Sequence, residues 1–468
     1  MAKPWATLGI DLHLEPSGPG LRRGLTDALR DAVRTGRLAP GARLPSSRSL
    51  AADLGIARNT VAESYAELVA EGWLTTRQGS ATRVAERTVT PPTGAPAPPR
   101  AVTPPRPERP RPAYDLVPGS PDLAAFPRTE WLKAARRAFL AAPHQALGYG
   151  DPRGRAELRT ALADYLSRAR GVRADPERVV VCAGLVHGLQ LLGRVLRARG
   201  VARVAVESYG LASHRKQLTA AGLDTVPLPF DELGTDPAEL THEGAVLLTP
   251  AHQFPMGVPL HRDRRATVVD WARRTGGLVL EDDYDGEFRY DRQPVGALQG
   301  LDPDHVVYLG TASKSLAPGL RLAWMVLPPT LVAEVTAAKG GVDTCGVLDQ
   351  LTLAEFLTSG AYDRHVRAAR LRYRRRRDAL VRALATHAPH LQVTGIAAGL
   401  HAVLRLPPGT EQSVVQAATW QGLALHGLTF YRYEAATTQP LDALVVGYGT
   451  PPDHAWAGAL EALCRALP

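Results

Sequence analysis

A proline-rich segment limits how this 468-residue chain can fold. Residues 90–112 read TPPTGAPAPPRAVTPPRPERPRP, with ten prolines and almost no large apolar side chain. Because proline fixes φ and lacks a backbone N–H donor, this segment can form neither a helix nor a central strand, and we expect an extended, semi-rigid spacer. The sequence therefore predicts a small N-terminal module over 1–86, a linker over 87–114 and a large module over 115–468.

The chain is mildly basic, and its charge is unevenly distributed. The formal net charge of +9 divides into +2 for 1–86, +4 for 87–114 and +3 for 115–468. The predicted linker is therefore the most basic part per residue and can attract a polyanion without reading its sequence. Only five of the 55 basic residues are lysines, so a lysine in a predicted site is a candidate for chemistry that arginine cannot perform.

Cysteine usage and hydropathy exclude two classes of protein. Three scattered cysteines, Cys182, Cys345 and Cys464, give neither a disulfide scaffold nor metal-ligand spacing, as is typical of the reducing cytoplasm. The N-terminal residues contain no long apolar signal segment, and no run of about 18 apolar residues could span a bilayer. We therefore expect a cytoplasmic protein that is neither secreted nor inserted in a membrane.

The N-terminal module has the pattern of a winged helix-turn-helix. Apolar residues at helical spacing, a cap at Ser46 or Ser47, and a glycine-containing turn between two short strand patterns define its elements. We expect helices over 21–37, 48–54 and 59–71, and a β-hairpin that pairs 73–75 with 82–84. The third helix then presents Arg58, Asn59 and Thr60 at its N-terminal end, where a recognition helix meets base edges.

DNA binding and protein docking both use this fold. Arg43, Ser46 and Arg48 can contact phosphates, and the wing arginines Arg77 and Arg83 a groove or the backbone, but a module charge of +2 leaves both functions open. The pattern LPSSRSLAADLGIARNTVAESYAELVAEGWLTTRQGSATRV strongly resembles the GntR family of bacterial winged-helix repressors. This resemblance implies operator contacts at Arg43, Ser46, Arg48, Arg58, Asn59, Thr60 and Gly79.

In the large module, apolar β-branched runs alternate with helical stretches. This pattern indicates parallel βα units whose sheet is covered on both faces. The strand-like runs are 179–184, 203–208, 245–250, 277–284, 305–310 and 321–327. Ligands of such sheets bind at the carboxyl ends of the strands, so the residues that follow each run are the site candidates.

Three of these strand ends carry groups that suit pyridoxal 5′-phosphate (PLP). Gly184 opens a helix whose free N–H groups can hold a phosphate, and the carboxylates Asp282 and Asp283 can pair with a pyridinium nitrogen. Lys314, placed among Ser and Thr hydroxyls and ahead of Arg321, suits a Schiff base to an aldehyde. For the carboxylates, Mg²⁺ or Ca²⁺ ligation or a plain surface is the alternative.

The chain as a whole resembles the MocR subfamily, in which a GntR winged helix is fused to a fold type I aminotransferase domain. The segments that carry the resemblance are GSPDLAAFP, YGDPRGRAELR, TPAHQFPMG, EDDYDGEFRY and GTASKSLAPGLRLAW. The resemblance implies an α+β winged-helix domain joined to an α/β domain with a mostly parallel sheet, plus a small C-terminal subdomain from about residue 340. It also implies a transcriptional regulator that uses PLP as cofactor or effector and forms a head-to-tail homodimer.

The resemblance assigns roles residue by residue. Lys314 matches the lysine that binds the cofactor. Asp282 matches the residue that keeps the pyridine nitrogen protonated, with Asp283 as second choice, and Tyr284 matches the tyrosine at the phenolic oxygen. Tyr149 matches a tyrosine that reaches the phosphate of the partner subunit. The other matches are Gly184, Leu185, Val186, Thr311, Ser313 and Arg321 for the phosphate, and His252 and Gln253 for the aminotransferase Asn-Pro motif.

The chain departs from the subfamily pattern at two places. Leu211 stands where an aromatic residue usually stacks on the pyridine ring, so either Tyr209 turns in or the ring packs on an aliphatic side chain. No arginine aligns with the one that binds a substrate carboxylate in aminotransferases, and Arg405 and Arg432 are the candidates. The leading hypothesis is a DNA-binding regulator that senses PLP or its adduct with an amine or amino acid. The alternatives are a working aminotransferase with an accessory DNA-binding module and, less favoured, a docking scaffold.

Overall fold

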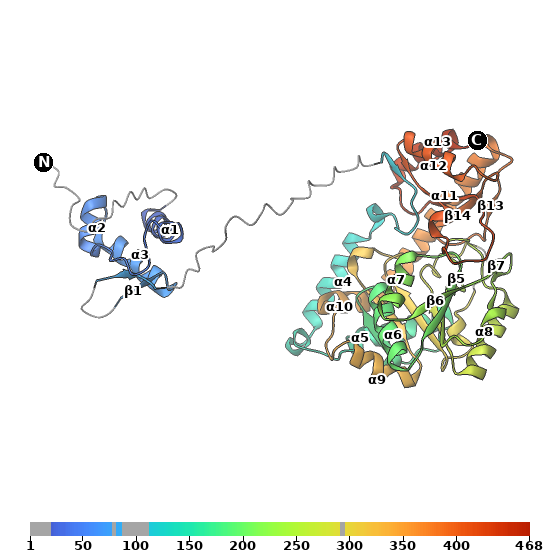
Figure 1. Cartoon of the computed structure of the whole chain (residues 1–468), viewed down its shortest axis with the longest axis horizontal. Helices are drawn as coiled ribbons and strands as arrows, with labels where there is room; N and C mark the ends of the chain where they lie inside the picture. The colour runs from blue at the N-terminus through green and yellow to red at the C-terminus, as the bar shows by residue number, and fades with distance from the viewer. Residues whose placement is uncertain (1–19, 77–80, 87–111, 291–294) are drawn as a thin grey trace. The chain divides into compact units, whose positions relative to one another are not determined.

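A computed structural model describes residues 20–76, 81–86, 112–290 and 295–468 (Figure 1). The chain divides into two compact units, 1–108 and 109–468, and the boundary between them falls within the predicted linker. Residues 87–111 of that linker lie outside the described residues, as do Arg77 and Gly79.

The first unit consists of three helices and a two-stranded hairpin, which confirms the predicted winged-helix order. Its elements are α1 (Leu21–Arg34), α2 (Ser47–Leu54), α3 (Arg58–Ala70), β1 (Leu74–Thr75) and β2 (Arg83–Val84). α1 ends earlier than predicted at a tight turn, in which the Gly36 N–H donates to Val33 O at 3.2 Å and Gly36 takes a left-handed φ of 77°. β1 and β2 pair antiparallel, as expected for a wing.

The helices of this unit share one apolar core. Leu25 and Leu29 of α1, Val61 and Leu68 of α3, and Leu74 of β1 are buried together. Burial of one such side chain contributes roughly 1.5–3 kcal/mol, so this cluster holds the unit together. The polar residues at the N-terminal ends of α2 and α3 stay outside the core.

A seven-stranded sheet forms the centre of the second unit (Figure 1). The strands, in their order across the sheet, are β4 (Val179–Cys182), β12 (Ala323–Val326), β11 (Val306–Thr311), β10 (Leu278–Asp282), β9 (Ala245–Leu248), β5 (Arg203–Glu207) and β6 (Asp224–Leu228). β11, β10, β9, β5 and β6 are parallel neighbours, so their carboxyl ends lie along one edge. A separate short pair joins β7 (Phe230–Asp231) to β8 (Gly234–Thr235).

β12 departs from the predicted parallel arrangement. It runs antiparallel to both β11 and β4. Only residues 312–322 connect β11 to β12, whereas a parallel crossover needs a dozen or more residues, usually with a helix. The short connection returns the chain in the opposite direction and brings Arg321, just before β12, to the carboxyl ends of β4 and β11.

Helices cover both faces of the large sheet. They are α4 (Arg128–Ala141), α5 (Ala156–Arg170), α6 (Leu185–Ala198), α7 (Ala212–Ala220), α8 (Arg262–Thr275), α9 (Pro329–Ala338) and α10 (Val347–Thr358). Along β4, Val179 and Val181 pack with residues of α5 and α10, while Val180 and Cys182 pack with residues of α6 and α9. This alternation explains why the strand reads as a continuous apolar run.

A four-stranded sheet belongs to the C-terminal subdomain. In order across the sheet, the strands are β13 (Val393–Thr394), β14 (His401–Arg405), β17 (Ala443–Gly447) and β16 (His426–Gly427). The helices of the subdomain are α11 (Ala361–His387), α12 (Glu411–Trp420) and α13 (Trp456–Ala466). A separate short pair joins β15 (Leu423–Ala424) to β3 (Tyr114–Asp115). Tyr114, expected in the linker, is therefore part of the second unit. The predicted start near 340 is too early, because α10 packs against α4 and α5 of the large part.

The long helix α11 begins beside the loop that follows β11. Tyr362, in its first turn, hydrogen-bonds Ser315 Oγ at 2.8 Å and donates to Glu287 Oε1 at 3.2 Å. His365 Nε2 lies 2.7 Å from the Ser315 carbonyl oxygen. One continuous helix thus joins this loop to the C-terminal subdomain.

Candidate cofactor pocket and nucleic-acid interface

A cavity of about 290 Å³ opens at the carboxyl ends of β5, β9, β10 and β11. Its position is the one that the strand-end rule predicts for the ligand of such a sheet. The predicted site residues that line it are Leu185, Val186, Tyr209, Leu211, Asp282, Tyr284, Thr311, Ser313, Lys314 and Arg321. The chain thus brings together residues that are up to 136 positions apart in the sequence.

Lys314 follows β11, and its Nζ donates a hydrogen bond to the Gly119 carbonyl oxygen. Burial lowers the pKa of this lysine below its ordinary value, and the carboxylates of Asp282 and Asp285 partly oppose that effect. A lysine with a lowered pKa spends more time as the neutral amine, the form that attacks a carbonyl carbon. The cavity therefore holds a half-buried amine that can act as a nucleophile.

Asp282, at the end of β10, is buried and lacks a partner at one of its oxygens. The residue is 4% exposed, and no group in the described part of the chain hydrogen-bonds its Oδ1. Burial raises the pKa of this carboxyl well above its ordinary value, and Lys314 opposes the rise. A buried oxygen of this kind is stabilised by a cation that also donates a hydrogen bond, and a protonated pyridine nitrogen is such a group.

Asp283, the next residue, is held in a structural ion pair. Arg170 donates to its two oxygens at 2.6 and 2.9 Å, and the Tyr308 hydroxyl donates at 2.8 Å. Asp283 is not among the residues that line the cavity, so it is unsuited to the second-choice role at the pyridine nitrogen. In the described ranges, no group of three or more His, Cys, Asp or Glu side chains is arranged to hold a metal ion.

Tyr284, His252 and Asp285 form a buried hydrogen-bonded chain. His252 Nδ1 lies 2.8 Å from Asp285 Oδ2 and 3.0 Å from the Tyr284 hydroxyl oxygen. A carboxylate only accepts hydrogen bonds, so the contact with Asp285 indicates that His252 carries a proton on Nδ1. A protonated Nδ1 cannot accept a hydrogen bond from the Tyr284 hydroxyl. Burial raises the pKa of the Tyr284 phenol well above its ordinary value, and the nearby Asp285 carboxylate, which hydrogen-bonds the phenol, adds to the rise. His252 and Gln253 do not line the cavity.

The N-terminal end of α6 and the loop after β11 form a polar end of the cavity. Gly184, the N-cap of α6, has a φ of 87°, and a Cβ there would collide with the Arg321 guanidinium. Arg321 has a left-handed φ of 52°, a conformation that costs about 1 kcal/mol or more and clusters at functional sites. The hydroxyls of Thr311 and Ser313 lie 2.8 Å apart. Helix N–H groups, hydroxyls and a guanidinium together suit a phosphate.

Leu211, which stands at the position predicted to stack on the ring, lines the cavity, and so does Tyr209. The Tyr209 ring packs edge-on against Phe230, with 6.2 Å between centroids, and its hydroxyl donates to the Gln439 carbonyl oxygen at 3.5 Å. These contacts hold the Tyr209 ring in place. The geometry therefore favours the second of the two alternatives, in which a bound ring packs on the aliphatic side chain.

Neither predicted carboxylate partner lines the cavity. Arg432 donates to the carbonyl oxygens of Ala436 and Thr438 at 2.6 and 2.8 Å, so its guanidinium braces a loop. Arg405 is exposed at the end of β14, and His401, at the start of that strand, lines the cavity. Four residues of strand span about 13 Å, which explains why Arg405 stays outside. The structure gives no support to either arginine as a carboxylate partner here.

Sequence reasoning does not identify four ionisable residues of the lining: Glu207, His214, Arg215 and His401. His214 Nδ1 lies 3.9 Å from Asp282 Oδ2, and burial lowers the pKa of this histidine to about 4. Burial raises the pKa of Glu207 to about 7. Glu207 ends β5, and His214 and Arg215 lie in the first turn of α7. If the search at each strand end is extended into the helix that follows, it finds these three residues but not His401.

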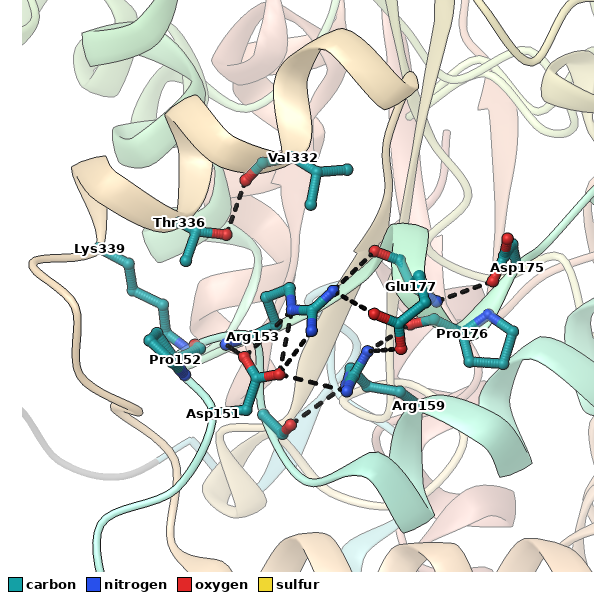
Figure 2. Close-up of polar contacts among 11 residues, drawn as sticks. Asp151, Pro152, Arg153, Arg159, Asp175, Pro176, Glu177, Val332, Thr336 and Lys339 are labelled. Carbon is teal, nitrogen blue, oxygen red and sulfur yellow. Dashed lines mark hydrogen bonds and ion pairs between the residues drawn. The ribbon is translucent and has the colours of Figure 1, made fainter.

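An ion-pair cluster anchors the loop that carries Tyr149 (Figure 2). Asp151 accepts from Arg153 at 2.6 Å and from Arg159 at 3.3 Å, and both arginines also pair with Glu177, at 2.7 and 3.0 Å. The Tyr149 side chain itself is fully exposed and does not line the cavity of its own subunit. A well-anchored loop thus presents an exposed tyrosine.

The residues predicted to meet DNA lie on the surface of the first unit. Arg43, Arg48, Arg58 and Asn59 are exposed, and within the described residues these arginines form no ion pair. Ser46 is exposed too, and its side chain accepts from a backbone N–H of α2 at 3.1 Å as the N-cap. The ends of α2 and α3 therefore present uncompensated positive charge.

Two further residues of this face, Thr60 and Arg83, differ in their surroundings. Thr60 is half-buried in the first turn of α3. The wing residue Arg83 donates to the Gly41 carbonyl oxygen at 2.9 Å and so ties the wing to the loop before α2. The predicted contacts at Arg77 and Gly79 lie outside the described residues.

Comparisons with known proteins match both units. Residues 21–84 match the gntR family of bacterial regulatory proteins, and residues 118–435 match aminotransferase class I and II. Over 453 residues the chain is 35% identical to the HTH-type pyridoxine biosynthesis transcriptional regulator PdxR of Corynebacterium glutamicum, with 94% of this chain and 95% of the relative covered. The chain belongs to the MocR subfamily of GntR transcriptional regulators.

Other matches agree with this assignment. The MocR-type chain is 32% identical over 448 residues to the probable rhizopine catabolism regulatory protein MocR of Rhizobium meliloti, covering 92% of this chain and 90% of that one. The crystal structure of Pyrococcus horikoshii kynurenine aminotransferase matches with a TM-score of 0.67 and 24% identity, covering 75% of this chain and 89% of that chain, which shows a shared fold. In the described ranges no helix is long and apolar enough to cross a membrane.

Proposed function

We propose that this transcriptional regulator binds PLP through Lys314 and that the bound cofactor, or its combination with an amine, controls operator binding. The observation that carries the proposal is the buried Asp282 Oδ1, which has no hydrogen-bond partner among the described residues and shares a cavity with a half-buried lysine of lowered pKa. A protonated pyridine nitrogen supplies both the charge and the donor that Oδ1 lacks.

The other polar groups of the cavity suit the rest of the cofactor. Bound PLP supplies an electrophilic carbonyl carbon and an electron sink. Tyr284 would donate its hydroxyl proton to the phenolic oxygen, and its raised pKa keeps that proton in place. The groups that would hold the phosphate are the N–H groups of Leu185 and Val186, the α6 N-cap Gly184, the hydroxyls of Thr311 and Ser313, and the Arg321 guanidinium. His252 would act from behind the wall, by fixing Tyr284.

We also propose a head-to-tail homodimer in which Tyr149 reaches the phosphate site of the partner subunit. Large apolar side chains are exposed along α4 and just before Tyr149: Leu132 at 67%, Phe139 at 51%, Leu140 at 73% and Leu147 at 56%. Exposed apolar side chains in such numbers mark an interaction surface. Light scattering of the purified chain should give twice the monomer mass of 50.2 kDa, and a monomer at micromolar concentration would reject this part.

On the DNA side, we propose that Arg58, Asn59 and Thr60 read base edges while Arg43, Ser46 and Arg48 hold phosphates. Arginines that form no ion pair within the described residues supply the charge that phosphates require. PLP can change operator affinity only by its different affinity for two conformations of the regulator.

The test is a footprint on the DNA that flanks the gene, made with and without PLP. We expect a protected operator whose half-saturation concentration changes by fivefold or more when PLP is added, the usual scale of coupling between sites. Equal protection in both conditions would reject PLP as an effector. The alternative function, a working aminotransferase, is favoured by the set of Lys314, Asp282, Tyr284 and Arg321, and sustained turnover at about 10 per second would establish it.

A further inference from the structure

Three lysine or arginine side chains line the cavity: Arg215, Lys314 and Arg321. The proposed cofactor accounts for the last two. Arg215 lies in the first turn of α7, four residues after Leu211, and has no role in holding PLP. Arg215 is therefore a cation of this mostly apolar cavity that the proposed cofactor does not use.

The contacts of Arg215 leave its charge without a carboxylate. Its Cζ lies 4.5 Å from the centroid of the Tyr433 ring, and Nη1 donates a long hydrogen bond of 3.4 Å to the Gly210 carbonyl oxygen. No salt bridge to Arg215 exists among the described residues. Burial lowers the pKa of the guanidinium below its ordinary value, and the Tyr433 and Glu434 side chains oppose the fall. A cation that is partly desolvated and lacks a salt-bridge partner favours the arrival of an anion.

The rest of the lining shows which kind of anion fits. Much of the lining of the cavity is apolar, with contributions from Leu211, Leu247, Phe254 and Leu400. Arg405 and Arg432 are not among the lining residues. A ligand whose charged group binds Arg215 therefore shares the cavity with aliphatic and aromatic side chains that can receive its apolar part.

We propose that Arg215 binds the carboxylate of the effector, which is an amino acid with an apolar side chain. This inference rests on the proposed function, because it assumes that an amine joins PLP in the cavity. The guanidinium can donate two parallel hydrogen bonds to a carboxylate, while the Tyr433 ring supports its face. The same amine without a carboxylate would leave Arg215 unpartnered and would bind more weakly.

The test compares L-phenylalanine with 2-phenylethylamine, its counterpart without the carboxylate. The dissociation constant of each is measured on the PLP-loaded, full-length protein from the absorbance spectrum of the bound cofactor. In the parent protein we expect L-phenylalanine to bind more tightly. In Arg215→Gln its affinity should fall about 10- to 100-fold, the range for a hydrogen bond to a charged group, while that of 2-phenylethylamine changes less than threefold.

Two control variants separate carboxylate binding from a bracing role. Arg215→Lys keeps the charge and should recover part of the preference for L-phenylalanine. Tyr433→Leu removes the ring beneath the guanidinium but leaves the charge, so it should reduce the preference less than Arg215→Gln does. Equal losses for the two ligands in Arg215→Gln, a greater loss of preference in Tyr433→Leu, or a parent that does not prefer L-phenylalanine would overturn the proposal.

Failure of the proposed function looks different from failure of this inference. If PLP does not bind, the purified protein shows no borohydride-sensitive absorbance band of the cofactor. The spectra of the parent and of Lys314→Ala are then the same. If PLP binds and the ratio of the two dissociation constants is the same in Arg215→Gln as in the parent, only the role of Arg215 is wrong.

Discussion

Replacing Arg170 by methionine should destabilise the second unit strongly. Arg170 and Asp283 share two hydrogen bonds of 2.6 and 2.9 Å, and their side chains are 3% and 1% exposed. Removing one partner of such a pair leaves a buried, uncompensated charge, which costs about 3–5 kcal/mol. Because both groups are almost fully buried, solvent does not screen this loss. The Tyr308 hydroxyl, 2.8 Å from Asp283, stays in place, so we expect the lower half of that range.

Urea unfolding of the full-length protein, followed by far-ultraviolet circular dichroism, measures this loss. The matched control is Arg168→Met on the same helix, whose partner Asp363 lies at 2.8 Å but whose own side chain is 61% exposed, so the expected loss is about 0–1 kcal/mol. The double variant Arg170→Met/Asp283→Leu should recover stability, because no buried charge is left. The reasoning is refuted if Arg170→Met costs no more than Arg168→Met. PLP affinity should also fall in Arg170→Met, because Asp283 directly follows Asp282 and loss of its ion pair would disturb the end of β10.

Three other outcomes are expected. Lys314→Ala should abolish the borohydride-sensitive absorbance band of PLP; an unchanged band would mean that another residue holds the cofactor. Arg58→Ala or Asn59→Ala should weaken operator binding in a gel shift by about 1–3 kcal/mol and leave that band intact, and unaltered affinity would remove these side chains from the interface. Glu207→Gln should gain thermal stability relative to the parent between pH 5 and pH 8. Burial raises the folded-state pKa of Glu207 to about 7, so its contribution is present at low pH and is lost as the pH rises through that value. Melting temperatures that run parallel across this range would contradict the raised pKa.

Much of the fold and part of the site follow from local sequence patterns. Each strand-like run of the large module contains a strand, since a strand buried on both faces must be apolar throughout. Lys314 and Asp282 were predictable as neighbours because they follow strands whose carboxyl ends share one edge of the sheet. The helices of the first unit were predictable from apolar spacing alone, to within three residues at their ends.

What the sequence could not predict depends on side-chain direction and on distant partners. The direction of β12 follows from a short connection, and the run of apolar residues is the same in either direction. The ion pair between Asp283 and Arg170 joins residues that are 113 positions apart in the sequence, so no local pattern distinguishes Asp283 from Asp282. Likewise, the difference between Arg432, which braces a loop, and Arg215, which lines the cavity, arises from where each loop or helix points the guanidinium.

The contacts at the start of α11 have a mechanical consequence. Tyr362 and His365 fasten the helix to Ser315, the residue next to Lys314. A helix of 27 residues is about 40 Å long at 1.5 Å per residue. If a structural change at Lys314 tilts this helix by roughly 5°, the C-terminal end of the helix is displaced by about 3 Å. A close-packed core cannot absorb a displacement of this size without repacking its side chains. A displacement of less than an ångström at Ser315 would thus cause side chains of the C-terminal subdomain to repack around the far end of α11.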